Sequence, residues 1–259
     1  MIPYGKQPTH YPCDAVGPVG MVGAFRMVGG GDLQKRDRVV AGTECLIVEG
    51  DSAAKSVDQV RDARVQSILA LQGKPLNAIK AGRDAARNNE VFCRIFETLL
   101  GSRMSKTADC DDAVRDEAIR KLASPQNCVY EKLVLLMDPD ADGIHCSVLM
   151  MAFFRKYASE LIRAGRIEVV RPPMFVFRLR AVSPNDVSRW PVASSPEHAA
   201  AVEDALQKHG VTDYQRIRHR GLGSLHVPLL RSTCVDPASR RQSCLTIEEV
   251  DNAISMFGS

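Results

Sequence analysis

The sequence contains no apolar run of about 20 residues, the length that a membrane-spanning helix needs, although 45% of its residues are hydrophobic. Its N-terminus also lacks the basic-then-apolar pattern of a signal peptide. These absences predict a cytoplasmic protein that makes no contact with membranes. The 259 residues, of which 25% are charged, suit one good-sized globular domain, or one domain with a smaller appendage.

No two cysteines have the Cys-x-x-Cys spacing that is typical of zinc sites. Cys45 and Cys146 lie within apolar stretches, where a free cysteine behaves as a small hydrophobic residue. In the expected compartment, reduced structural thiols are favoured over disulfides. The eight cysteines are scattered along the chain, at positions 13, 45, 93, 110, 128, 146, 234 and 244.

Neither sign of charge dominates, because 34 Lys and Arg residues nearly balance 31 Asp and Glu residues and leave a net charge of +3. Basic residues do cluster along the chain, a pattern that suits binding to phosphate backbones but equally suits a solvated face. Composition alone therefore leaves nucleic-acid binding open. The first cluster is Lys74, Lys80, Arg83 and Arg87, and the second is Arg216, Arg218, Arg220, Arg231, Arg240 and Arg241.

Periodicity and breakers predict an α/β layer fold. Residues 1–42 hold eight glycines and four prolines, which predicts an irregular, partly disordered arm. Residues 132–137 are apolar on both faces, as in the middle of a parallel sheet covered by helices. Further strands are expected at 45–48, 166–170 and 174–179, and helices from Asp51 or Ser52 (as the N-cap) to about 60, at 88–100 (capped by Asn88 or Asn89), at 109–121, at 144–164 and at 197–209.

Four carboxylates follow two of these strands. Glu49 comes directly after residues 45–48, and Asp138, Asp140 and Asp142 come after residues 132–137. In an open α/β sheet, functional groups gather at the carboxyl ends of the strands. If the two strands are neighbours, the four carboxylates meet at one edge, where they cannot all stay ionised without a cation. Oxygen ligands without His or Cys select hard ions such as Mg²⁺.

Three simpler interpretations compete with a metal site. An EF-hand would need a Glu at the twelfth position of the loop, where this chain has Leu149, and a helix where it has an apolar strand. The aspartates could also be turn formers, although three in alternation are more than a turn needs. Asp51 and Ser52 are expected to be an ordinary helix cap, which is compatible with the functional interpretation.

Six blocks of the sequence, in order, resemble motifs of the B subunits of type IIA DNA topoisomerases, the gyrase group. Together they cover roughly residues 30–250. Residues 49–53 resemble the EGDSA motif, 67–77 the PL(K/R)GKxLN segment, 138–143 the DxDxDG motif, 171–175 the QPPLY strand, 220–223 the KGLG motif and 236–241 the DPxxR ending.

The resemblance implies a TOPRIM domain at residues 43–180, which is Rossmann-like with a mostly parallel sheet and helices on both faces, and a small α+β tail at residues 181–259. It implies that Glu49 and Asp138 hold a catalytic Mg²⁺, for which Mn²⁺ can substitute, that Asp138 and Asp140 hold a second ion, and that Asp142 supports both. Glu49, Asp138 and Asp140 would thus be catalytic. Lys74, Asn77 and Arg220 would contact double-stranded DNA.

Several positions depart from the family pattern. Ala54 and Lys55 replace the Gly-Gly of bacterial members, Gln72 replaces a basic residue, and Ser224 stands where gyrase has Glu. A stretch near residues 103–127 is longer than in gyrase. None of these departures touches the metal ligands.

Residues 1–42 are too few to contain the family's ATPase region, so we expect no ATP site in this chain. None of its five tyrosines has the context of the attacking tyrosine. These gaps imply a partner that resembles the gyrase A subunit, and a separate ATPase subunit. The leading hypothesis is a DNA cleavage and religation module that is inactive alone, whether a fragment, a split subunit or a truncated paralogue. The alternative is a non-catalytic DNA-binding or scaffold protein. The Gly-Leu-Gly and Pro-Pro blocks argue against a nuclease or primase.

Overall fold

The computed structural model describes residues 20–22, 25–28, 39–82, 85, 89–101, 112–183 and 186–257. Within these ranges, no helix combines the length and the apolar character that crossing a bilayer requires. Arg83 and Arg87 of the first basic cluster lie outside the described residues, as do Asn88 and most of the expected N-terminal arm. Two short strands, Gly20–Val22 and Phe25–Val28, do lie within that arm.

The described residues form a seven-stranded mixed sheet and a separate three-stranded antiparallel sheet. The middle of the main sheet is parallel, with β3 paired to both β4 and β5, and β5 paired to β6. The outer strands are antiparallel to their neighbours: β1 to β2, β2 to β4, and β10 to β6. In spatial order the main sheet comprises β1 (Gly20–Val22), β2 (Phe25–Val28), β4 (Gln66–Ala70), β3 (Val40–Val48), β5 (Tyr130–Leu135), β6 (Ile167–Val170) and β10 (Gln242–Cys244).

Successive side chains of a strand point to opposite faces of the sheet, so alternate residues of the parallel strands pack into two different cores. Cys45, Ile47 and Leu135 face the larger core, where the rings of Phe92 and Phe153 lie 4.9 Å apart between two helices. Five helices contribute to this core: α4 (Glu90–Leu100), α5 (Asp112–Leu122), α6 (Ala141–Tyr157), α7 (Ser159–Arg163) and α10 (Ile247–Phe257).

Leu46, Val48 and Leu136 face the second core, on the opposite side of the sheet. Helix α2 (Asp51–Asp58) covers this side with Ala53, Ala54 and Val57. The remainder of the cover comes from the C-terminal third of the chain: the 3₁₀ turns Val187–Arg189 and Leu222–Ser224, α9 (Val227–Leu230) and a π-helical turn, Arg231–Val235. The main sheet is therefore buried on both faces, which is why its central strands are nearly continuous apolar runs.

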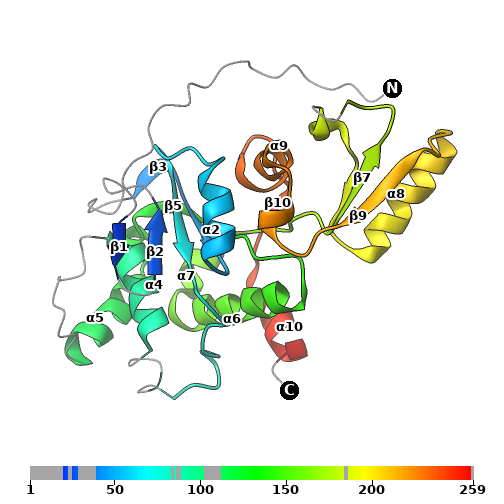
Figure 1. Ribbon diagram of the computed structural model, residues 1–259. Coiled ribbons are helices and arrows are strands. Elements are labelled where there is room, and N and C mark those ends of the chain that lie inside the picture. Colours follow the sequence, from blue (N-terminus) through cyan, green and yellow to red (C-terminus); the bar gives the residue numbers. More distant parts are fainter. Residues whose placement is uncertain are drawn as a thin grey trace.

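The three-stranded sheet lies to one side of the main sheet, with α8 (Pro196–Lys208) packed on it (Figure 1). Its strands are β8 (Val192–Ala193), β7 (Phe175–Leu179) and β9 (Tyr214–Arg218), with β7 in the middle. After β9 the chain returns to the main sheet, where β10 pairs with β6 and α10 packs along α6. The expected α/β fold with a small C-terminal α+β region is confirmed.

Most of the expected elements form, but the structure also differs from the prediction. Gly50 is the N-cap of α2 and makes no side-chain cap bond, so the expected Asp51 or Ser52 cap is wrong. The helix expected at 144–164 is two helices, because the backbone at Ala158 leaves the helical region (φ −147°, ψ 40°). Several elements have no counterpart in the prediction, namely β4 and the C-terminal β8, β9, β10, α9 and α10. The short 3₁₀ turn Pro125–Asn127 precedes β5.

A buried ionic network joins the C-terminal segment to the main sheet. The guanidinium of Arg240, whose side chain is 0% exposed, contacts both carboxylate oxygens of Glu44, at 2.5 and 2.8 Å, and one oxygen of Glu168 at 3.4 Å. Gln66 Nε2 donates to Glu44 at 2.7 Å, and Lys132 Nζ lies 2.9 Å from Glu168. Each buried charge thus has a partner of opposite sign, which is what makes its burial tolerable.

We expect Arg240→Ala to lower the free energy of unfolding by roughly 3–5 kcal/mol, because the buried Glu44 would lose its cation and Glu168 would keep only Lys132. Urea denaturation followed by circular dichroism measures the loss. Arg241→Ala is the matched control: the Arg241 side chain is exposed, and its removal should change stability by less than about 0.5 kcal/mol. Equal effects of the two substitutions would contradict the role of the network.

Candidate metal and DNA site

The carboxyl ends of β3 and β5 are followed by the four predicted carboxylates, and together they form an acidic edge of the main sheet (Glu49, Asp138, Asp140 and Asp142). The two strands are adjacent and parallel, with Ile47 opposite Leu135, so Glu49 and Asp138 follow neighbouring strands as expected. Helix α2, which follows β3, covers one face of the sheet, whereas α6, which follows β5, covers the other. Connections that diverge in this way create a crevice between the strand ends, where α/β proteins bind ligands.

Asp138 is held at this edge by the backbone of a distant segment. Its Oδ1 accepts a hydrogen bond from the Leu222 N–H at 2.9 Å. A Cβ on Gly221 would lie 2.9 Å from Oδ2, so a larger residue there would displace the carboxylate. On the other side, a Cβ on Gly143 would lie 2.1 Å from the backbone oxygen of Asp138, a contact that only glycine avoids. Asp138 therefore sits between two glycines of two different motifs.

Asp140 and Asp142 belong to the start of α6. Asp140 is the N-cap of this helix, and its Oδ1 accepts from the Gly143 N–H at 2.9 Å. Asp142 lies in the first turn, where a negative charge is favoured by the helix dipole. Its Oδ1 lies 2.6 Å from Lys74 Nζ, and both side chains are largely exposed.

The electrostatics of the edge reflect crowded carboxylates. Burial raises the pKa of Glu49 above its ordinary value, and the charges of Asp138, Asp140 and Asp142 raise it further, whereas Lys74 opposes the shift. Burial also raises the pKa of Asp138, against the Leu222 hydrogen bond, which lowers it. The pKa of Asp142 is lowered by its hydrogen bond to Lys74. The four carboxylates therefore carry more negative charge than Lys74, the cation beside them, neutralises.

The chemistry of these residues fits a hard divalent cation. Glu49 Oε2 is buried and has no hydrogen-bond partner, and the three neighbouring aspartates supply further carboxylate oxygens, the ligands that such an ion prefers. As they stand, no three His, Cys, Asp or Glu side chains of the described ranges are arranged around one point as metal ligands. Asp138, Asp140 and Asp142 are turned toward the Leu222 amide, the Gly143 amide and Lys74, respectively.

The three residues expected to contact DNA lie in different surroundings. Lys74 borders the acidic edge through Asp142. Asn77 Oδ1 accepts from the backbone N–H groups of Ile79 and Lys80, at 3.0 and 3.2 Å, and so caps a turn. Arg220 is exposed and immediately precedes the Gly221–Leu222 seat of Asp138.

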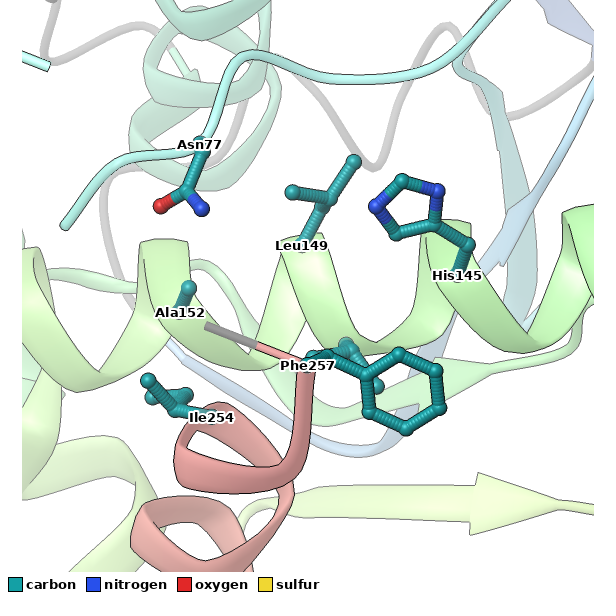
Figure 2. Close-up of a pocket in the computed structure, with 7 residues that line it drawn as sticks. Asn77, His145, Leu149, Ala152, Ile254 and Phe257 are labelled. Atoms are coloured by element: carbon teal, nitrogen blue, oxygen red, sulfur yellow. The ribbon is translucent and has the colours of Figure 1, made fainter. Parts of the chain in front are cut away.

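Asn77 also borders a small pocket between its loop, α6 and α10 (Figure 2). In Figure 2 the side chains of His145 and Leu149 project from α6, and that of Phe257 comes from the end of α10. The pocket volume is about 20 Å³, room for little more than one water molecule, so it is not a site for a substrate. Its seven lining residues are Asn77, His145, Val148, Leu149, Ala152, Ile254 and Phe257.

Two features of the edge were absent from the sequence-based prediction. The Leu222 N–H has no side-chain signature, so only the spacing of glycines in 220–223 could have indicated a close backbone approach. Gln72 Nε2 donates to Asp51 Oδ1 at 3.0 Å, which links the loop after β4 to the start of α2. That contact joins residues of two motifs that are separated by 21 positions.

We expect Glu49 and Asp138 to destabilise the metal-free protein increasingly as pH rises above about 4, the ordinary pKa of a carboxyl group. Glu49 and Asp138 have raised pKa values in the folded state, so the folded protein binds protons more tightly than the unfolded chain until the pH exceeds those raised values. Glu49→Gln should therefore melt a few degrees higher than the native protein at pH 7 with a chelator present. This difference should vanish toward pH 4.

Glu97→Gln is the control for this melting experiment. Glu97 is exposed on α4, far along the chain from the acidic residues. The Glu97→Gln substitution should leave the pH dependence of the melting temperature unchanged. A native-like melting temperature for Glu49→Gln at pH 7 would show that the Glu49 charge carries no cost in the folded protein.

Known proteins provide an independent comparison. Residues 44–172 match the model of the Toprim domain. The chain is 33% identical over 216 residues (83% of its length) to the DNA gyrase B subunit of Micrococcus luteus, and 30% identical over 211 residues (81%) to the DNA topoisomerase 4 B subunit of Enterococcus faecalis. It spans 27% of the length of each of these relatives. The chain therefore belongs to the Toprim family and is a relative of the B subunits of DNA gyrase and DNA topoisomerase 4.

Proposed function

We propose that this chain is the Mg²⁺-dependent DNA cleavage and religation module of a type IIA DNA topoisomerase. The observation that carries the proposal is the position of Glu49 and Asp138, at the carboxyl ends of adjacent parallel strands, with one Glu49 oxygen buried and unpartnered. Similarity to gyrase and topoisomerase 4 B subunits supports the same activity.

Glu49, Asp138 and Asp140 would hold the metal, with Asp142 in support, and Mn²⁺ could take the place of Mg²⁺. When bound, the ion would stabilise negative charge on the scissile phosphate and on the departing 3′ oxygen. The Leu222 amide orients the Asp138 carboxylate, since it fixes one of its two oxygens. Lys74, Asn77 and Arg220 would position the DNA, with the two cations directed at phosphates.

The attacking tyrosine would come from a partner that resembles the gyrase A subunit. Its oxygen would attack phosphorus, the bond from phosphorus to the 3′ oxygen would break, and the phosphate would remain joined to the tyrosine until religation. Among the tyrosines of the described ranges, Tyr130 and Tyr157 are buried and Tyr214 packs against Phe177 in the small sheet.

We expect Asp138→Asn to remove most Mg²⁺ or Mn²⁺ binding in titration calorimetry. The amide oxygen can still accept from the Leu222 N–H, so the substitution removes a charge and leaves the seat of the side chain in place. Asp204→Asn makes the same chemical change at an exposed position of α8 and should bind the metal as the native protein does. Unchanged binding by Asp138→Asn would sink the metal assignment.

We expect the isolated chain to bind plasmid weakly and in a salt-sensitive manner, and to leave its topology unchanged. With a cognate A-type subunit and Mg²⁺, denaturing gels should show cleaved DNA linked to a tyrosine of that partner. Asp140→Ser should reduce cleavage without abolishing DNA binding, because it removes a proposed metal ligand and no cationic DNA contact. Serine is preferable to alanine here because it retains an N-cap acceptor for α6.

Relaxation of supercoiled plasmid by the isolated chain would refute the need for a partner nucleophile. Persistent DNA binding without cleavage, whatever A-type partner is added, would instead favour a non-catalytic DNA-binding or scaffold protein on the same fold. The two outcomes are distinguished by gel analysis of the same plasmid.

A further inference from the structure

The loop that follows β4 crosses the acidic edge and contacts acidic residues on both sides of it. Gln72 Nε2 donates to Asp51 Oδ1, at the start of α2, and Lys74 Nζ donates to Asp142 Oδ1 at 2.6 Å, at the start of α6. Gln72 and Gly73 have positive φ angles of 52° and 119°, which turn the chain between the two contacts. The loop therefore brings an ammonium group to the carboxylates that are proposed to hold the metal.

The charge of Lys74 acts on more than its immediate partner. Of the charged groups that act on Glu49, three aspartates raise its pKa and Lys74 lowers it. Lys74 likewise lowers the pKa of the buried Cys146 thiol, which burial raises most and which Glu49, Asp142 and Asp140 raise further. In the metal-free protein, this ammonium is a counter-ion for the acidic edge as a whole.

The ion pair is nevertheless easily broken. The side chains of Lys74 and Asp142 are 47% and 66% exposed, and pairs of this kind stabilise a protein by only about 0–1 kcal/mol. A DNA phosphate offers Lys74 another anion, and a divalent cation offers Asp142 twice the charge. The buried Arg240 pair, in contrast, has no exposed guanidinium surface through which a competitor could enter.

We propose that Lys74 is an exchangeable counter-ion, which neutralises Asp142 in the metal-free protein and moves to a DNA phosphate when DNA binds. The exchange removes one positive charge from the metal site, so DNA strengthens metal binding. By thermodynamic linkage, metal strengthens DNA binding by the same factor. The inference rests on the proposed function, and it adds a coupling between the two ligands of the site.

Calorimetric titration of the full chain with Mn²⁺, first without DNA, tests the exchange. Lys74→Met should bind Mn²⁺ about three- to tenfold more tightly than the native protein, because a positive charge a few ångströms from the ion disappears. A short DNA duplex should tighten Mn²⁺ binding to the native protein and have little effect on Lys74→Met. Lys80→Met removes the same charge from an exposed position six residues further on, and its Mn²⁺ affinity should match that of the native protein.

A second variant reads the exchange from the DNA side. Asp142→Asn should raise the affinity for a fluorescent duplex several-fold without metal, because Lys74 no longer has to leave a carboxylate; Asp204→Asn should leave it unchanged. Unchanged or weaker Mn²⁺ binding by Lys74→Met, or unchanged DNA affinity of Asp142→Asn, overturns the exchange while the proposed function stands. If the native protein and Asp138→Asn bind Mn²⁺ equally, both proposals are overturned.

Discussion

The parallel pairing of β3 with β5 is the constraint on which the rest of the molecule depends. It puts the ends of two buried strands side by side, and the helices that follow leave toward opposite faces of the sheet. Glu49 and Asp138 meet at the crevice so formed. The flanking strands, both cores and the C-terminal segment keep this pair of strands dry and in register, while the site itself consists of a few side chains beyond their last residues.

Such a site works against stability. Burial and mutual repulsion raise the pKa values of Glu49 and Asp138, so keeping both ionised costs free energy in the folded state. Distant backbone groups limit this cost: the Leu222 amide lies 84 positions from Asp138 and still donates to it. The buried pair of Arg240 with Glu44, in the middle of β3, ties the C-terminal segment that delivers this amide to the same sheet.

The ends of β3 and β5 could be predicted from the sequence, because residues 45–48 and 132–137 are apolar on both faces and are followed by carboxylates. The sequence-based prediction missed β4, whose five buried residues, Gln66–Ala70, begin with two polar ones and lack a clear period. It also predicted that Asp51 or Ser52 caps α2, whereas the N-cap is Gly50, which has an extended backbone. The seat of Asp138 could not be predicted, since a backbone amide leaves no trace in composition and its approach depends on tertiary packing.

The chain leaves the main sheet after Val170 and returns to it at Gln242, and these two residues are paired in register. Everything between them is an excursion whose two ends meet at one point of the sheet edge. Lengthening a turn between the strands of the small sheet and α8 mainly adds to the entropy of closing a loop, which varies slowly with length. Evolution can therefore remodel the small sheet and α8 without disturbing the strand order. The lobe beside the site is the part of this architecture that is most open to diversification.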